Sequence, residues 1–409
     1  MTANAVLNPN QAETPVELAP KTEIDAQFEK APINWVPAFV LLATPLAAFI
    51  IVPWYLWTHT VSLAVWAVFG AFMVWNGMSI TAGYHRLWSH KAYNAHPIVK
   101  WFLLTGGTLA VQGSVFDWCA GHRIHHRHVD DVYKDPYSVK RGFWFAHMGW
   151  MLRNYPSGNF DYKNIPDLKA DPLLVAQDKY YPLWILLANI GLPAAAGYLV
   201  GDVKGTLVLA GLLRLVLSHH FTFFINSLCH IYGTRPYTDT NTARDNPILA
   251  LFTWGEGYHN YHHYFQYDYR NGVKWWQYDP TKWFIYGLSK IGLASELKRV
   301  PDVAITHAQV DMKFKTAHSK FEDFAETLTA DMQHFKDKVS HEYQAFNQTI
   351  EEWQELKTQA VEMKKNDFAK KVHEVDEKLK GSFREIEKKL KSHGKQLERV
   401  LTQLKGRTA

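Results

Sequence analysis

Residues 61–90 read VSLAVWAVFGAFMVWNGMSITAGYHRLWSH, an apolar run followed at once by His85 and His90. About 20 apolar residues are enough for a helix to cross a bilayer. Three further runs of this kind cover residues 36–57, 181–199 and 206–228. The sequence therefore predicts four membrane-spanning helices, and it places polar, metal-binding side chains directly where one of them meets water.

The pattern His-x-x-His-His occurs twice near such helix ends, at His122, His125 and His126 and at His259, His262 and His263. On an α-helix, positions i, i+3 and i+4 share one face, so we expect each triplet to direct three imidazoles at one spot. With His85, His90 and His230, nine imidazoles gather at the membrane surface, more than one tetrahedral zinc ion takes. We expect a dinuclear metal centre, and ligand type alone leaves zinc, iron and copper open.

Two acidic residues near these clusters, Asp130 and Glu256, are candidates for orienting the imidazole N–H groups. Arg214, near the middle of the span at 206–228, is costly in a membrane unless it faces a polar interior or pairs with a carboxylate. We expect it to form a buried pair or to support the site.

Charged residues predict how the chain is oriented in the membrane. The short connectors at 58–60 and 200–205 make two helical hairpins, and the connectors on that side carry only Lys204. The other side carries a group of basic residues, namely Arg86, Lys91, Arg123, Arg127, Lys140, Arg141 and Arg153. The positive-inside rule places both termini and the metal site in the cytoplasm. A disulfide between Cys119 and Cys229 is not expected on that reducing side.

The composition divides the chain into three parts. Residues 1–30 lack an apolar segment and are expected to be a disordered tail, and residues 31–302 form the membrane domain. Residues 303–409 are charged, with apolar residues at helical spacing in two stretches. The first stretch contains Phe321, Phe324, Leu328, Met332, Phe335, Val339, Phe346, Ile350 and Trp353, and the second contains Phe368, Val372, Val375, Leu379, Phe383, Ile386 and Leu390.

We therefore predict an all-α membrane protein with four transmembrane helices, a cytosolic histidine-rich cap and a C-terminal amphipathic helical extension. The extension is expected to be a coiled coil or a helical hairpin with a role in association, self-association included. A net charge of +5 over 409 residues gives no reason to expect nucleic acid as a partner.

The segments HRLWSH, HRIHHRHVD and GEGYHNYHH resemble the three histidine boxes of membrane-bound fatty acyl desaturases, particularly the stearoyl-CoA Δ9 type. The resemblance covers about residues 33–300. It implies a four-helix membrane stem under a cytosolic cap, and two iron ions held by His85, His90, His122, His125, His126, His230, His259, His262 and His263. Asn226, one helical turn before His230, matches an asparagine that reaches a metal through water in this family.

The function that the resemblance implies is O2-dependent insertion of a cis double bond, at the Δ9 position, into a long-chain saturated acyl substrate. No side-chain acid or base can remove hydrogen from an unactivated C–H bond, so the oxidant is expected to be oxygen at the metal ions. Neutral imidazoles suit metal ions with that role. The chain lacks the haem motif of fused cytochrome b5 domains, so electrons are expected from a separate protein of the ferredoxin, cytochrome b5 or reductase type.

Several residues are candidates for binding the substrate. Lys140 and Arg141 match a basic pair suited to a phosphate, and Trp118 lies in the segment before the second box. Phe69 and Met73, one turn apart, are expected where the acyl tail ends, about 18 Å from the metals for Met73 at about 1.5 Å per residue. Gly113, Ala120 and Gly121 replace an Asn, an Arg and an Asp of the animal enzymes, which leaves coenzyme A, acyl carrier protein and a membrane lipid open as carriers.

Two other functions remain as alternatives. A membrane fatty-acid or alkane hydroxylase uses similar boxes and would insert oxygen instead of removing hydrogen. A non-enzymatic, metal-dependent membrane scaffold would place the function in the C-terminal helices. The residues of the three histidine boxes favour desaturation over both alternatives.

Overall fold

The computed structural model describes residues 21–323 and 330–366, together with residues 385, 388, 389, 392, 395, 399 and 402. Four of its helical segments are long and apolar enough to cross a membrane, as predicted: Trp35–Thr58, Leu63–Ser89, Tyr181–Val200 and Val203–His230. The first segment is α2 (Trp35–Thr58), and the second joins α3 (Leu63–Met78) to the π-helix η1 (Ser79–Ser89). The other two consist of α9 (Tyr181–Leu186), η5 (Leu187–Gly191) and α10 (Leu192–Val200), and of α11 (Val203–Thr206), η6 (Leu207–Leu213), α12 (Arg214–Ser227) and η7 (Leu228–His230).

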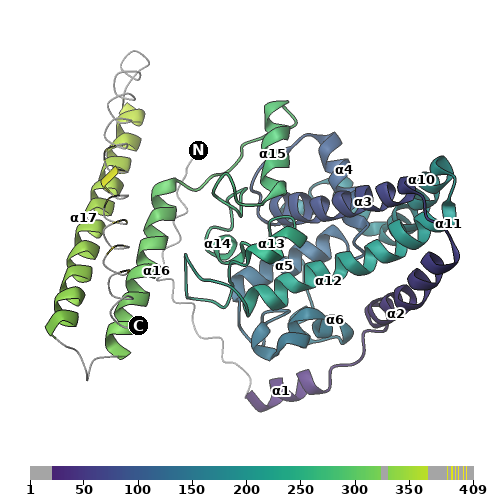
Figure 1. Ribbon diagram of the computed structural model, residues 1–409, viewed down its shortest axis with the longest axis horizontal. Helices are drawn as coiled ribbons and strands as arrows, with labels where there is room; N and C mark the ends of the chain where they lie inside the picture. Colours follow the sequence, from purple (N-terminus) through teal and green to yellow (C-terminus); the bar gives the residue numbers. More distant parts are fainter. Residues whose placement is uncertain are drawn as a thin grey trace.

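The second and fourth segments are longer than a bilayer requires. They contain 27 and 28 residues, which corresponds to about 40 Å of helix against a hydrocarbon core of about 30 Å. The excess carries both segments beyond the apolar layer at the end where His85 and His230 lie. The membrane helices themselves therefore extend into the cap (Figure 1).

At the opposite end of the bundle the two hairpins meet. Ser62 caps the start of α3, and the connector between α10 and α11 turns at Gly201, whose φ of 79° lies in the left-handed region that favours glycine. Asp202 accepts the backbone N–H of Gly205 at 2.7 Å and the Tyr55 hydroxyl of α2 at 3.1 Å. This polar contact fixes the first hairpin against the second.

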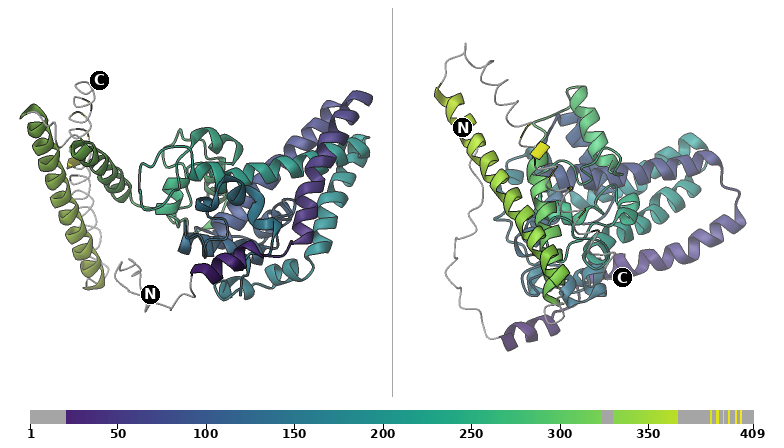
Figure 2. Two further views of the ribbon diagram at one scale, coloured as in Figure 1. Left: turned by 90° about the horizontal axis from the view of Figure 1, so that it is seen from below. Right: turned by 60° about the vertical axis from the view of Figure 1, so that its left-hand side comes forward.

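The cap is built from short helices between and after the hairpins. They are α4 (Pro97–Thr108), α5 (Val115–His128), η2 (Val139–Arg141), η3 (Phe145–Gly149), α6 (Trp150–Leu152), η4 (Pro156–Gly158), α7 (Pro166–Lys169), α8 (Pro172–Lys179), α13 (Pro247–Phe252), α14 (His259–Tyr264) and α15 (Pro280–Lys290). A two-residue strand β1 (Asn94–Ala95) pairs antiparallel with β2 (Ala294–Ser295). Figure 2 shows the cap helices gathered at one end of the long membrane helices.

A compact core joins η1, α4 and α5. Tyr84 of η1, Leu103 of α4 and Cys119 of α5 are all completely buried in it. A Cβ atom at Gly107 would meet the Tyr84 ring at 2.4 Å, so glycine allows α4 to approach η1 closely. Serine and aspartate form a capping box at the start of α5, with Ser114 and Asp117 bonding each other's backbone N–H groups. This core and the capping box together fix the directions of η1 and α5, which both carry candidate ligand histidines.

The N-terminal region differs from the disordered tail expected for residues 1–30. Residues 21–29 form helix α1 (Lys21–Glu29), and Phe28 at its end is only 5% exposed. The Phe28 ring stacks on Tyr155 and receives the Arg141 guanidinium at 3.9 Å. Asp25 of the same helix also accepts the Tyr133 hydroxyl at 2.9 Å. These contacts attach α1 to the cap, and the tail's composition gave no sign of them.

The C-terminal extension begins as a helical hairpin of α16 (Asp302–Asp323) and α17 (Ala330–Asn366), which lie side by side in Figures 1 and 2. Phe314 stacks on Tyr343 with centroids 3.7 Å apart, and Val339, Phe346 and Ile350 are buried as their spacing predicted. Within residues 302–323 and 330–366 the extension forms this hairpin, and the coiled coil stays a prediction. The second apolar stretch, residues 368–390, lies almost entirely outside the described residues.

Helix α16 belongs with the cap more closely than the expected boundary at residue 302 suggested. Its Ile305 and Ala308 pack in one cluster with Tyr237 and with Tyr261 of α14. Gln309 donates a hydrogen bond to the Tyr237 hydroxyl at 3.2 Å. The compact unit around the histidines therefore continues through α16.

Arg214 forms buried hydrogen bonds within the bundle. Its guanidinium donates to the carbonyl oxygens of Ala210 and Leu109, at 3.0 and 2.5 Å, and to the Asn189 side-chain oxygen at 2.6 Å. Among the described residues no carboxylate pairs with it. Carbonyl oxygens and one amide thus give Arg214 the polar interior that an arginine in a membrane span requires, one of the two alternatives expected from the sequence.

Candidate metal centre

The nine histidines singled out from the sequence come together in two clusters. A five-histidine cluster consists of His85, His90, His122, His126 and His262, and a four-histidine cluster consists of His125, His230, His259 and His263. In each cluster the ligand-type nitrogens all lie within 4.8 Å of one another. The prediction that the three segments converge is confirmed.

Each His-x-x-His-His triplet divides between the two clusters, which differs from our expectation of three imidazoles at one spot. On α5, His122 and His126 face the five-histidine cluster and His125 faces the other. On α14 the assignment is reversed, because His259 and His263 join the four-histidine cluster and His262 joins the five. Residues i and i+4 share a face most closely, while the residue at i+3 is rotated enough to reach the neighbouring cluster.

The first histidine pair depends on a π-helix. In an α-helix, residues five apart point about 140° away from each other, so His85 and His90 would not share a site. Within η1 the His90 N–H bonds the His85 carbonyl at 3.1 Å, an i to i+5 bond that brings both side chains to one face. The spacing of five in HRLWSH was the only sequence sign of this turn.

Buried carboxylates hold several imidazoles by the nitrogen that faces away from the cluster. Glu256 lies 2.9 Å from His85 Nδ1 and Asp135 lies 2.9 Å from His125 Nδ1. His230 Nδ1 is 2.8 Å from the Thr242 hydroxyl, which in turn lies 2.5 Å from Asp130. A proton donated from Nδ1 leaves the lone pair on Nε2, the nitrogen that faces the cluster.

Of these acids, the sequence suggested Glu256 and Asp130. Asp130 acts only through Thr242, and Asp135 was missed because it lies in a loop ten residues after His125, where no periodicity marks it. Glu256 is itself held by Arg86, at 2.9 Å, and by the Asn271 amide, at 2.6 Å.

The electrostatics of the centre favour neutral imidazoles beside ionised carboxylates. Burial lowers the pKa of His122, His126, His259, His262 and His263 well below the ordinary value, and neighbouring imidazoles lower it further. Burial would raise the pKa of the Glu256 carboxyl, but His85 and Arg86 outweigh it and hold that pKa below its usual range. All of these groups are therefore in the protonation state that binding a cation requires.

The spacing of the nitrogens fits metal ions. The Nε2 atoms of His85 and His262, and of His262 and His126, are 2.9 Å apart, and those of His125 and His263 are 3.3 Å apart. Ligand bonds of about 2.1 Å place adjacent nitrogens of one coordination shell about 3.0–3.4 Å apart. The donor sets thus fit two cations, one in each cluster.

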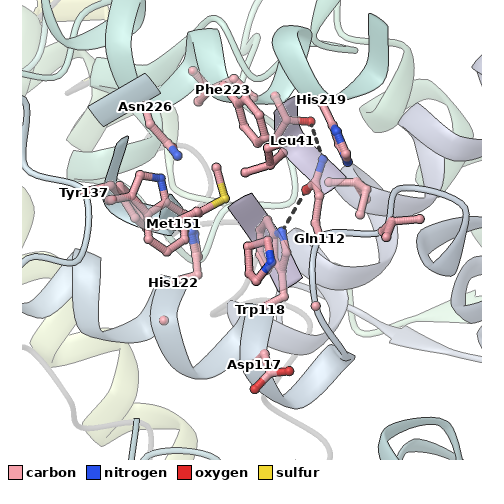
Figure 3. A pocket seen from close by; sticks show the side chains of 18 of the residues that line it. Leu41, Gln112, Asp117, Trp118, His122, Tyr137, Met151, His219, Phe223 and Asn226 are labelled. Carbon is pink, nitrogen blue, oxygen red and sulfur yellow. Dashed lines mark hydrogen bonds between the residues drawn. The ribbon is translucent and has the colours of Figure 1, made fainter. Parts of the chain in front are cut away.

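A cavity of about 1080 Å³ reaches the centre from one side. Its walls include His85, His122, His125 and His259, whereas most of the rest is apolar. The side chain of Gln112 braces the wall, accepting from the Trp118 indole at 3.2 Å and donating to Thr222 at 3.0 Å (Figure 3). Asn226 also lines the cavity beside Tyr137, as Figure 3 shows.

The candidate substrate residues separate into two groups. Trp118 and Met73 line the cavity, and the Trp118 ring stacks on His122 with centroids 4.9 Å apart. Phe69 does not line it, because its side chain packs in the cluster of Val65 and Leu209 between the helices. The expectation for Phe69 is corrected accordingly.

The basic pair Lys140 and Arg141 does not reach the cavity either. Lys140 is exposed, and Arg141 is enclosed by the rings of Phe28, Phe145 and Tyr155, at 3.9, 4.2 and 5.1 Å. Burial lowers the pKa of Arg141. Arg141 fastens α1 to the cap, and the phosphate-binding role expected for the pair stays a prediction.

Four apolar spans and a cap with two clusters of buried imidazoles define an integral membrane protein whose histidines are suited to binding metal beside an apolar cavity. A family model described as fatty acid desaturase matches residues 63–289. The chain belongs to the fatty acid desaturase family.

Named relatives agree with this assignment. The chain is 42% identical over 285 residues to a protein named probable acyl-CoA desaturase from Schizosaccharomyces pombe, covering 69% of this chain and 58% of that protein. It is 41% identical over 295 residues to acyl-CoA desaturase 1 from Saccharomyces cerevisiae, covering 70% and 56%. It is 38% identical over 246 residues to the stearoyl-CoA desaturase of Bos taurus, covering 59% and 68%. The alignments thus span less than three fifths of the two yeast proteins' length.

Proposed function

We propose that this protein is an O2-dependent fatty acyl desaturase that introduces a cis double bond, at the Δ9 position, into a long-chain saturated acyl group. The observation that carries the proposal is the opening of two imidazole clusters onto one apolar cavity. Membership of the desaturase family supports it. The names of the relatives favour coenzyme A as the acyl carrier.

One iron ion would be held by the five-histidine cluster and one by the four-histidine cluster, and Asn226, which lines the cavity, would contribute through water. When bound, the two irons supply the O2-dependent oxidation of an unactivated C–H bond, which no side chain can perform. The chain's own contribution is to hold the ligands still. Glu256 and Asp135 fix the tautomer and direction of His85 and His125, and Thr242 with Asp130 does the same for His230.

The cavity wall positions the acyl chain against the centre. Trp118, stacked on His122 and bonded to Gln112, forms a rigid flat surface at the metals. Gln112 also binds Thr222 of α12, so the wall is fixed from α5 and from the fourth span together. An acyl chain packed on this surface presents one pair of carbons to the centre, and the apolar lining excludes water from it.

The test is to express the full chain in a host that lacks desaturase activity, to identify the acyl products by gas chromatography and to measure iron in the purified protein. We expect about two irons per chain and a cis-alkene at one position. A hydroxylated acyl product would instead establish a hydroxylase, and zinc-dependent turnover with inactive iron-loaded protein would refute the iron assignment.

Two histidine variants distinguish a residue of the metal centre from a histidine that lies outside it. His262→Ala should abolish the alkene and lower the metal content of folded protein, because His262 lies 2.9 Å from both His85 and His126. His96→Ala is the matched control, since His96 caps α4 and belongs to neither cluster. Equal loss of alkene and of metal in both variants would show that neither depends on the imidazoles of the clusters in particular.

A further inference from the structure

Helix α5 supplies candidate ligands to both clusters from neighbouring positions. His122 faces the five-histidine cluster, where its Nε2 atom lies 2.8 Å from His90 Nε2. His125 faces the four-histidine cluster, where its Nε2 atom lies 3.3 Å from His263 Nε2. In both imidazoles Nε2 is the nitrogen turned to the cluster, so Nδ1 is left for a partner elsewhere in the cap.

The loop at residues 135–137 contacts both of these imidazoles. Asp135 Oδ1 accepts the Nδ1–H of His125 at 2.9 Å and the backbone N–H of Tyr137 at 3.1 Å. The second of these bonds makes an Asx turn, which fixes the backbone from which the Tyr137 side chain leaves. The Tyr137 hydroxyl oxygen lies 3.4 Å from His122 Nδ1 and accepts its N–H. One loop thus reaches one histidine of each cluster.

The Tyr137 ring also packs directly on a histidine of the other cluster. Its centroid lies 4.4 Å from the centroid of the His125 ring. Trp150 of α6 packs on Tyr137 as well, with centroids 5.1 Å apart, and Tyr137 is only 7% exposed. A buried ring that packs against other rings has little room to move, so its contact with His125 is fixed.

The two contacts of Tyr137 differ in kind and serve different clusters. Its hydroxyl meets His122 of the five-histidine cluster, and its ring meets His125 of the four-histidine cluster. His125 has the Asp135 carboxylate as a second support. In the part of the chain that the structure describes, no carboxylate forms an ion pair with His122, which makes the phenol hydroxyl the partner on its Nδ1 side.

We propose that Tyr137 is a positioning residue shared by the two clusters, whose hydroxyl orients His122 and whose ring orients His125. This inference rests on the proposed function. A His122 imidazole that keeps its proton on Nδ1, bonded to the Tyr137 oxygen, has its lone pair on Nε2, where the cluster needs it. One side chain thereby sets the directions of two ligands, one in each cluster.

The same side chain belongs to the wall that the acyl chain contacts. Tyr137 and Trp118 both line the cavity, and Trp118 stacks on the His122 ring with centroids 4.9 Å apart. Figure 3 shows these three side chains together at the cavity. The rings on which an acyl chain packs are therefore the rings that hold the ligands, so the acyl carbons and both clusters are positioned by one rigid part of the wall.

The test uses the full chain loaded with cobalt(II) in place of iron, because cobalt(II) bound to imidazoles absorbs visible light. The loss of cobalt to an excess of chelator is followed by that absorption. Tyr137→Phe keeps the ring and removes the hydroxyl, so one of the two cobalt ions should leave at least tenfold faster and the other at a rate changed by less than twofold. Tyr137→Leu removes both contacts and should speed the loss of both ions.

A second background shows which ion belongs to which cluster. His90→Ala removes a member of the five-histidine cluster and leaves the four-histidine cluster complete. In that background Tyr137→Phe should leave the rate for the remaining ion unchanged, whereas Tyr137→Leu should still raise it. A merely structural role of Tyr137 would not separate the two ions in this way. Circular dichroism of each metal-free variant checks that the protein is folded.

Tyr181→Phe is the matched control, because Tyr181 lines the same cavity and its hydroxyl has no hydrogen-bond partner among the described residues. It should change neither rate by more than twofold. Equal acceleration of both ions by Tyr137→Phe, or unchanged rates in Tyr137→Phe and Tyr137→Leu, would overturn the shared positioning role.

The measurement also separates this inference from the proposed function, since cobalt loss needs no acyl substrate. A protein that loses cobalt in the expected pattern but makes no alkene when loaded with iron would refute the proposed function and leave the role of Tyr137 standing. An active desaturase whose Tyr137→Phe variant loses both ions at unchanged rates would refute the role of Tyr137 alone.

Discussion

At the scale of single residues, the buried carboxylate beside His85 can be tested directly. Glu256→Gln keeps the shape of the side chain but removes the charge that faces His85 and Arg86. We expect metal affinity to fall about 10- to 100-fold, as for other partners of metal-ligating histidines. Metal per chain after dialysis against a chelator measures it.

Glu296→Gln is the matched control for that experiment. Glu296 is exposed and its carboxylate accepts only the Asn94 amide among the described residues. Unchanged metal retention in Glu256→Gln, or an equal loss in the control, would show that the buried carboxylate does not orient His85.

The length of the acyl chain gives a second test at this scale. Met73 lines the cavity on α3, so Met73→Trp should fill the space beyond the metals and shift the products toward shorter chains. Phe69→Trp, one turn away but packed between helices, should leave the product lengths unchanged. Gas chromatography of the acyl products decides, and an unaltered profile in an active Met73→Trp protein would place the cavity's end elsewhere.

The candidate ligands could be predicted because their signal is local. Three histidines at positions i, i+3 and i+4 are visible in five letters of sequence, and two such segments at helix ends, with His85 and His90 at a third, imply convergence. Asp135 and Thr242 could not be found, since they meet their histidines through loops whose paths depend on the finished fold. The contact of Arg141 with three aromatic rings could not be predicted either, because charge alone does not show it.

At the scale of elements, apolar length predicted the four spans because a bilayer imposes a minimum on it. The π-helical turn of η1 was beyond such reasoning, because it is set by packing of Tyr84 and Trp88 against α4 and α5 and not by local preference. Helix α1 was missed for a related reason. Its contact with the cap is made by Phe28 and by the Asp25 carboxylate, single residues that set up no apolar period.

Helix α16 provides the element-scale prediction. Ile305 is 7% exposed and packs with Tyr237 and Tyr261, the latter between the histidines of α14. Ile305→Ala should lower the thermal midpoint of the full chain, by a loss of about 2–4 kcal/mol in the free energy of unfolding. Thermal unfolding, monitored by tyrosine and tryptophan fluorescence, measures the midpoint.

The control for α16 is Thr306→Ala, whose hydroxyl bonds only its own helix backbone. If Ile305→Ala and the control unfold alike, α16 is an appendage and not a part of the cap. The packing of Ile305 on Tyr261 ties the first helix of the extension to the cap.

At the scale of the whole molecule, the positive-inside rule makes a prediction about sidedness. Cysteine placed at Thr60, in the connector between the first two spans, should react with a membrane-impermeant thiol reagent from outside intact cells. Cysteine placed at Lys163, in the cap, should react only after the membrane is opened. Cys119 and Cys229 are buried and do not interfere. The reverse labelling pattern would invert the orientation.

The hydrogen bonds of Arg214 have a consequence for how the protein is assembled during its synthesis. A lone arginine at the centre of a helix opposes release from the translocation channel into lipid by about 2.5–3.5 kcal/mol. Its partner Asn189 lies on the preceding span, only a short connector away, and binds it at 2.6 Å. The third and fourth spans are therefore expected to leave the channel together as a prefolded pair, so that replacing Asn189 would appear first as a defect in membrane insertion, before any effect on the finished enzyme.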